Sequence, residues 1–143
     1  MKLLLDTDTC IHIIRKKSPR LIASITSLPP GELGISSITL AELEHGAEKS
    51  LDPAKNRQAL EHFLIPIEIA VFDAAAAFHY GRVRCSLERA GRVIGSNDLL
   101  IAAHAISLSV PVVTGNVSEF SRVPGLKVEN WISPGDEWKA ISG

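Results

Sequence analysis

The amino-acid sequence predicts an α/β domain in which helices flank a mainly parallel central sheet. Short apolar runs alternate along the chain with longer segments of helical character. The runs are apolar almost throughout, which is typical of parallel strands covered by helices on both faces. The chain has 143 residues, of which 45% are hydrophobic and 22% charged, so we expect one globular domain over residues 1–143.

Two strands and two helices are expected in the first 37 residues. The apolar run "KLLL" at residues 2–5 predicts a buried strand, and "LGISS" at residues 33–37 predicts a second. Between them we expect a helix capped by Thr7 or Asp8, followed by another helix over residues 19–28.

The later elements follow from caps and breakers. Asp52 is a good helix cap and Pro53 suits the first helical position. Asp73 and Gly91 have the residue types that open and close a long helix. The expected order is a helix from Thr39, a helix from Asp52, a strand within residues 65–72, helices over 73–91 and 98–109, a strand at 111–115, a loop, and a strand at 126–131.

Composition and charge exclude several classes of protein. The net charge is −1, so a domain built mainly of basic surface to grip nucleic acid is excluded. Any contact with a polyanion must use a local patch or a metal. Cys10 and Cys85 lie far apart and form no CxxC motif, which favours a reduced, cytoplasmic protein. No secretory signal or membrane-spanning segment is expected, because acids and Pro66 interrupt the apolar runs.

Four polar residues occupy junctions between strands and helices. Asp6 follows the first strand, Glu42 lies in the first turn of the helix expected after the second, Asp98 starts a helix, and Asn116 follows the strand "VVT". The carboxyl ends of parallel strands form one edge of the sheet, where functional groups gather. Three carboxylates that meet there repel one another unless a divalent cation joins them. Mg²⁺ and Mn²⁺ prefer such oxygen ligands and can activate water and a phosphodiester.

Each of these acids also has a purely local interpretation. Asp6 could cap the helix that follows it, and Asp98 could interact with the dipole of its own helix. Thr39 and Glu42 match the capping-box pattern S/T-x-x-E, which needs no catalytic role. The residues alone therefore leave both a metal site and ordinary helix caps open.

Four segments of the chain resemble one known family in order and spacing. They are "LLLDTDTCIHII", "ISSITLAELEHGAEKS", "GSNDLLIAAHA" and "VVTGNVSEFSRVPGLKVENW". The chain is similar in them to PIN-domain proteins, specifically the VapC-type toxin ribonucleases of bacterial toxin–antitoxin pairs. The resemblance implies a PIN fold and an endoribonuclease that depends on Mg²⁺ or Mn²⁺, with Asp6, Glu42 and Asp98 as metal ligands and a metal-activated water as nucleophile. It also implies a VapB-like antitoxin, a homodimer, and an RNA substrate for which tRNA is one candidate.

The sequence departs from the family pattern beside the expected site. Many PIN domains carry an acid where this chain has Asn116, whose amide can bind a metal or a water but adds no charge. Glu119, three residues further on, could take that place or could be a solvated surface residue. Asp8 stands where relatives of this type often have Asn. Thr7, Ser37 and Thr114 could orient ligands or serve as ordinary caps.

The remaining polar residues give weaker indications. His104 is expected to be packed and hydrogen-bonded, and Cys10 to lie in the core. The basic candidates for phosphate contact are residues 15–17 and Arg84, Arg89 and Arg92. With only seven aromatic residues in the chain, base stacking is not an evident mode of RNA recognition.

Two other functions remain as alternatives. The segment "DTDTC" approximates the D-x-D-x-[T/V] motif of haloacid-dehalogenase-type phosphatases, although its fifth residue is Cys10. No paired-Asp motif follows later in the chain. A catalytically silent PIN-like protein that only binds a partner is the second alternative, and cleavage of RNA separates it from an enzyme.

Overall fold

The computed structural model describes residues 1–16 and 19–131, which form a sheet of five parallel strands. The strand order is β3-β2-β1-β4-β5, so the first strand lies at the centre of the sheet. The strands are β1 (Leu3–Leu5), β2 (Leu33–Ser36), β3 (Glu68–Ala70), β4 (Val112–Val113) and β5 (Val128–Glu129). All of the strand pairings are parallel, which confirms the predicted α/β class.

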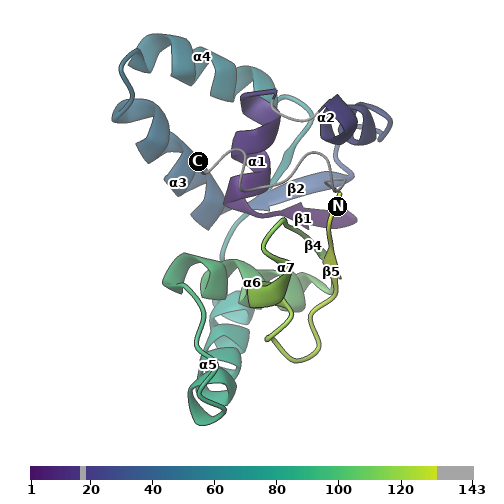
Figure 1. The fold of residues 1–143 in the computed structure, drawn as a ribbon, viewed down its shortest axis with the longest axis vertical. Coiled ribbons are helices and arrows are strands. Elements are labelled where there is room, and N and C mark those ends of the chain that lie inside the picture. The colour runs from purple at the N-terminus through teal and green to yellow at the C-terminus, as the bar shows by residue number, and fades with distance from the viewer. Residues whose placement is uncertain (17–18, 132–143) are drawn as a thin grey trace.

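Helices cover both faces of the sheet (Figure 1). Figure 1 shows α1, α3 and α4 on one side and α5, α6 and α7 on the other. The helices are α1 (Thr7–Ile14), α2 (Pro19–Thr26), α3 (Ser37–Glu48), α4 (Pro53–Leu64), α5 (Ala74–Arg89), α6 (Ser96–Leu108) and α7 (Val117–Phe120). None of the helices in the described ranges is both long and apolar enough to cross a membrane.

The central strands β1 and β4 are apolar because each of their faces packs against helices. Side chains alternate between the two faces of a strand. Leu4 and Val112 belong to the core cluster shared with α5 and α6, whereas Leu5 and Val113 belong to the cluster shared with α1, α3 and α4. All four side chains are almost fully buried. The central strands therefore join two cores into one domain.

Several predicted helix ends are confirmed by their caps. The Asp52 carboxylate accepts a hydrogen bond from the Lys55 amide at 3.2 Å, with Pro53 at the start of α4. The Asp73 carboxylate accepts one from the Ala76 amide at 3.0 Å at the start of α5. Gly91 follows α5 with a φ of 65°, a conformation in which glycine carries little strain.

The predicted starts of the helices after β1 and β2 are wrong. Helix α3 begins at Ser37 rather than Thr39, because Ser36 at the end of β2 caps it by accepting a hydrogen bond from the Ile38 amide at 3.1 Å. Thr39 is therefore inside the helix, and Glu42 lies beyond the first turn, so the capping box does not form. Helix α1 is capped by Asp6 rather than by Thr7 or Asp8.

Two further differences lie beside the expected site. Helix α6 begins at Ser96, two residues before the predicted start, with Asp98 in its first turn. The segment expected as a loop after "VVTG" contains the short helix α7, which begins after Asn116. This turn matters because it brings residues 116 and 119 back towards the sheet edge at which β1, β2 and β4 end.

Candidate metal centre

Asp6 is the most buried of the predicted site residues, with a relative exposure of 2%. The backbone leaves β1 here, and the Asp6 amide donates to the Val113 carbonyl at 3.1 Å. The Asp6 Oδ1 atom accepts the Thr9 amide at 2.9 Å and the Thr9 hydroxyl, and Oδ2 accepts the Thr114 hydroxyl at 2.6 Å. Asp6 is thus both a helix cap and a carboxylate fixed at the junction of β1 and β4.

Glu42 extends from α3 towards the first turns of α1 and α6. Its Oε1 atom accepts the Thr7 hydroxyl at 2.6 Å, and its Oε2 atom accepts the Asn97 side-chain amide at 2.9 Å. Its partners are thus 35 and 55 residues away in sequence. Glu42 therefore does not cap its own helix, which was one of the two interpretations of the sequence. Its contact with Asn97 places it close to Asp98.

Asp98 and Glu119 lie together against Gly95. The Gly95 amide donates to Glu119 Oε1 at 2.6 Å, and Glu119 is close enough to Asp98 to raise the pKa of that carboxyl group in addition to the effect of burial. A methyl group in place of the Gly95 hydrogen would lie 3.3 Å from Glu119 Oε1 and 3.7 Å from Asp98 Oδ2. The Asn116 side-chain amide also donates to Glu119. Asn116 is thus beside the site, with its amide group directed at Glu119.

We call Asp6, Asp8, Glu42, Asp98 and Glu119 the acidic cluster, because each interacts electrostatically with another member. Burial raises the pKa of Asp6 to about 6, against the opposing effect of the hydrogen bonds from Thr114 and Thr9. Burial, followed by the charges of Glu119 and Asp6, raises the pKa of Asp98 to about 7. Burial and the charges of Glu42 and Glu119 raise the pKa of Asp8.

The acidic cluster suits a hard divalent cation by the chemistry of its donors. Its groups are carboxylates, the ligands that Mg²⁺ and Mn²⁺ prefer. Within residues 1–16 and 19–131, no lysine or arginine forms an ion pair with any member of the cluster. The described part of the chain therefore leaves the negative charge of the cluster unneutralised, and a bound cation would relieve the repulsion.

The present side-chain arrangement is not yet that of a coordination shell. Among the described residues, no three acidic, histidine or cysteine side chains converge as the ligands of one ion. The carboxylates are instead occupied by hydrogen bonds from threonine, asparagine and glycine. Glu42, Asp98 and Glu119 are less buried than Asp6. Their side chains therefore have room to rotate, and such rotation would bring their carboxylates together around an ion.

The fold and the position of these acids agree with one protein family. A model of the PIN domain matches residues 3–126. The chain therefore belongs to the PIN-domain family. Within the family it is of the VapC type, as the following relatives show, and this assignment decides against the phosphatase interpretation of "DTDTC".

Two relatives have names that specify an activity. The chain is 44% identical over 131 residues to the tRNA(fMet)-specific endonuclease VapC of Salmonella typhimurium, covering 92% of this chain and 98% of the relative. It is 43% identical over 129 residues to ribonuclease VapC2 of Rickettsia felis, covering 90% and 96%.

Two solved structures are similar in fold as well as in sequence. DNA-bound VapBC from Salmonella typhimurium aligns with a TM-score of 0.87 and 44% identity, covering 92% of this chain and 98% of that chain. VapBC2 from Rickettsia felis, bound to a DNA fragment from their promoter, aligns with a TM-score of 0.85 and 40% identity, covering 92% and 99%.

All five acids of the cluster could be named from the sequence, but some of the groups that hold them could not. Asn97, which binds Glu42, was not singled out, although it directly precedes Asp98. Thr7 and Thr114 do orient carboxylates, whereas the Ser37 hydroxyl accepts from the Phe72 amide instead. His104 is buried and bonded to Ser36 at 2.8 Å, as predicted.

The pKa of Asp6 predicts a specific pH dependence of stability in EDTA. The unfolded carboxyl loses its proton near pH 4, whereas the folded one keeps it until about pH 6. The folded state therefore binds more protons between these values, and the free energy of unfolding falls as the pH rises. The fall attributable to Asp6 is on the order of 3 kcal/mol. Urea unfolding at pH 4.5 and 7.5 captures about 2 kcal/mol of this fall, because the unfolded carboxyl is already mostly ionised at pH 4.5, and Asp6→Asn should show a smaller fall. An identical pH dependence in both proteins would contradict the assignment.

Proposed function

We propose that the protein is a toxin endoribonuclease that depends on Mg²⁺ or Mn²⁺ and cleaves tRNA. The observation that carries the proposal is the acidic cluster, whose charge no lysine or arginine of the described residues neutralises. It lies at the carboxyl edge of the sheet of a VapC-type chain. The relative from Salmonella typhimurium, similar over nearly its whole length, is named a tRNA(fMet)-specific endonuclease, which supports RNA and specifically tRNA as the substrate.

Asp6, Glu42 and Asp98 are proposed to hold the ion. When bound, Mg²⁺ or Mn²⁺ supplies Lewis-acid stabilisation of the charge that develops on the phosphate and favours deprotonation of the attacking water. Asp6 is the fixed anchor, because Thr9 and Thr114 hold both of its oxygens. Glu42 is oriented by hydrogen bonds from Thr7 and Asn97. When these two bonds break, its side chain can turn towards Asp98.

Glu119 is proposed as the fourth carboxylate, with Asn116 as its positioning residue. Glu119 lies beside Asp98, and its charge adds to the effect of burial in raising the pKa of Asp98. With Asp98 bound to the ion, the Glu119 carboxylate would be the base that takes up the proton released by the attacking water. The Asn116 amide directs Glu119 into this arrangement and supplies no charge of its own.

Replacing Glu119 by glutamine should lower the cleavage rate about 10–100-fold, the range seen when a group supporting a metal site is removed. Asn116→Ala should have a smaller effect, because it removes only one of the two donors to Glu119. The measurement is the cleavage rate of a labelled tRNA at fixed Mn²⁺. Glu61→Gln, an exposed site on α4, is the matched control and should behave as the wild type. Full activity of the Glu119→Gln variant would mean that Glu119 is not the fourth group of the site, and Asn116 would then be the remaining candidate.

A VapB-like antitoxin is proposed to inhibit the protein from the groove between α1, α3 and α4. This cavity of about 400 Å³ is lined by apolar side chains, among them Ile11, Leu43 and Leu60, and by polar ones that include the acids Asp8 and Glu42 and the bases Arg15 and Lys49. A peptide with an apolar face would fit the walls. A basic side chain such as arginine would pair with the acids and occupy the place of the cation. The similarity to VapBC structures supports this class of partner.

A homodimer is also part of the proposal. The edge strand β3 and the segment that follows it expose apolar side chains, with relative exposures of 41% at Ile69 and 72% at Val71. A second copy of the chain would remove such a patch from water. Because the sheet ends at β3, this edge is free for an intermolecular contact among the described residues.

The substrate is tested by sequencing the 5′ ends of RNAs cut by the purified protein in Mn²⁺. The proposal predicts one or a few sites, concentrated in tRNA, that disappear in EDTA. Cuts spread over many RNAs without preference for tRNA would contradict the substrate. No cleavage of any RNA would favour the silent PIN-like protein.

A further inference from the structure

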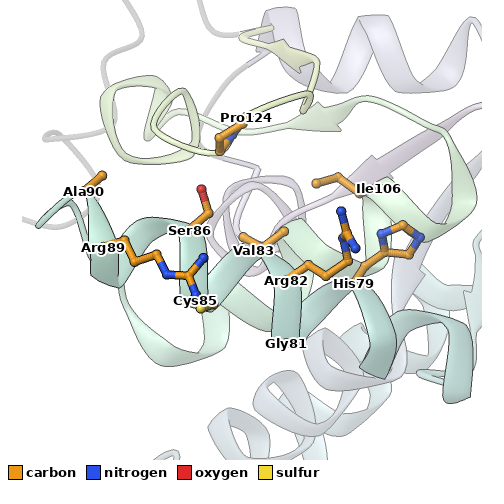
Figure 2. A pocket seen from close by; sticks show the side chains of 10 residues that line it. All are labelled: His79, Gly81, Arg82, Val83, Cys85, Ser86, Arg89, Ala90, Ile106 and Pro124. Carbon is orange, nitrogen blue, oxygen red and sulfur yellow. The ribbon is translucent and has the colours of Figure 1, made fainter.

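A second large cavity lies along α5, away from the acidic cluster. It has a volume of about 890 Å³ and contains none of the five acids. Figure 2 shows α5 forming one wall, with Ile106 and Pro124 across from it. Its lining comprises His79, Gly81, Arg82, Val83, Cys85, Ser86, Arg89, Ala90, Ile106 and Pro124. We call it the α5 groove.

The polar lining of the α5 groove is a stripe on one face of the helix. His79, Arg82, Ser86 and Arg89 are spaced by three, four and three residues, the spacing that aligns side chains along a helix. The groove therefore presents two guanidinium groups, an imidazole and a hydroxyl in a row. No acidic residue is among the residues that line it.

The two arginines of the groove, Arg82 and Arg89, differ from Arg84 on the adjoining face in the side chains with which they interact. Arg84 hydrogen-bonds the Tyr80 hydroxyl at 2.9 Å and Glu88 at 3.4 Å. Within the described residues, Arg82 and Arg89 form no ion pair, and Arg82 lies over the Phe78 ring at 5.6 Å from its centroid. In a protein of net charge −1, this is a local positive surface whose charge no acid of residues 1–16 and 19–131 compensates through an ion pair.

The α5 groove is linked to the acidic cluster through one segment of chain. Glu119 binds the Gly95 amide, and three residues later the Arg122 side chain donates to the Val93 carbonyl at 3.2 Å. Pro124, two residues further on, lines the groove. The segment from Glu119 to Pro124 thus leads from the carboxylates to the groove along the start of α6.

On the basis of the proposed function, we propose that the α5 groove binds the phosphate backbone of the RNA substrate outside the cleavage site. The row of cations complements a chain of phosphates, and Ser86 can donate to a phosphate oxygen. The groove contains no Phe, Tyr or Trp side chain, so it holds the backbone without stacking on bases. Arg84, which the sequence grouped with Arg89 as a basic candidate, is not part of this contact.

The test measures RNA binding without cleavage. A fluorescein-labelled single-stranded RNA of 20 nucleotides is titrated with the full chain in EDTA, and fluorescence anisotropy gives Kd at several salt concentrations. The Arg82→Ala/Arg89→Ala double variant should weaken binding at least about fivefold at low salt. It should also reduce the slope of log K against log salt by about 1.4, because each arginine that neutralises a phosphate of a single strand adds about 0.7 to that slope. Arg84→Ala removes one positive charge from the same helix and should leave Kd and slope unchanged, whereas Arg82→Ala, which also removes one, should weaken binding and lower the slope by about 0.7.

Three outcomes would overturn the proposal. They are a wild-type protein that does not bind the RNA, equal losses of affinity in the double variant and Arg84→Ala, or a double variant that binds normally. Light scattering on the same samples identifies the alternative: a double variant with normal RNA affinity but an altered oligomeric state would make the groove a subunit interface. If the wild type binds RNA through Arg82 and Arg89 yet cleaves none with Mn²⁺, the proposed function fails while the groove assignment stands.

Discussion

Asp98→Asn should lower the rate of RNA cleavage about a hundredfold or more while leaving the fold intact. Loss of a supporting group around a metal costs about 10–100-fold, and loss of a direct ligand should cost at least the upper end of that range. The variant keeps the size of the side chain, and helix α6 has no side-chain cap at Gly95 that it could disturb. Without metal the variant should be as stable as the wild type or more so, because one carboxylate of a mutually repelling cluster is removed.

The comparison needs both cleavage rates and thermal melts in EDTA. If Asp98 serves only the dipole of its helix, Asp98→Asn should retain activity, because that interaction is worth less than about 1 kcal/mol at such a site. Asp73→Asn is a matched control, since Asp73 also begins a helix but lies outside the acidic cluster. Near-wild-type cleavage by Asp98→Asn would remove Asp98 from the metal site.

Mn²⁺ should raise the melting temperature of the wild-type protein by roughly 10 °C at a concentration about a hundred times its Kd. A ligand that binds only the folded state at that excess contributes about 2.7 kcal/mol, and a domain of this size gains a few degrees for each kcal/mol. Burial, together with the neighbouring acids, raises the pKa of Asp98 to about 7 and also raises the pKa of Asp8. Protons therefore compete with the ion for these carboxyl groups at pH 5, and the gain should be larger at pH 7.5.

The melting experiment has an internal control in the pair Asp6→Asn and Asp52→Asn. Asp6 is proposed to anchor the ion, whereas Asp52 caps α4 on the surface. The shift with Mn²⁺ should shrink strongly in the first variant and persist in the second. An equal shift in both variants would mean that Mn²⁺ binds elsewhere on the protein.

The strands and most helices could be predicted because their signals are local. The runs "KLLL" and "PVVTG" are apolar because helices cover both faces of the sheet, and Asp52 and Asp73 cap helices within three residues of themselves. Helix α3 begins earlier than predicted because Ser36 ends a strand and caps a helix at once. The pattern Thr39-x-x-Glu42 resembles the N-terminus of a helix, but α3 has already begun at Ser37, directly after the end of β2.

The acids of the site could be placed at the sheet edge from sequence, but their partners could not. Glu42 is held by Thr7 and Asn97, which come from other elements and carry no periodic signal. The choice between Asn116 and Glu119 depends on helix α7, a single short turn inside a segment rich in loop-forming residues. Only the folded chain shows that this turn directs the Asn116 amide onto Glu119 beside Gly95.

The central claim is that this VapC-type chain cleaves RNA with a divalent ion held by the acidic cluster. The most direct measurement is the cleavage rate of a labelled tRNA by the EDTA-treated protein as Mn²⁺ is added back, with Asp98→Asn in parallel. We expect no cleavage in EDTA, a rate that rises and saturates with Mn²⁺ in the wild type, and little or no recovery in the variant. Cleavage that continues undiminished in EDTA, or that Mn²⁺ restores equally in both proteins, would contradict it.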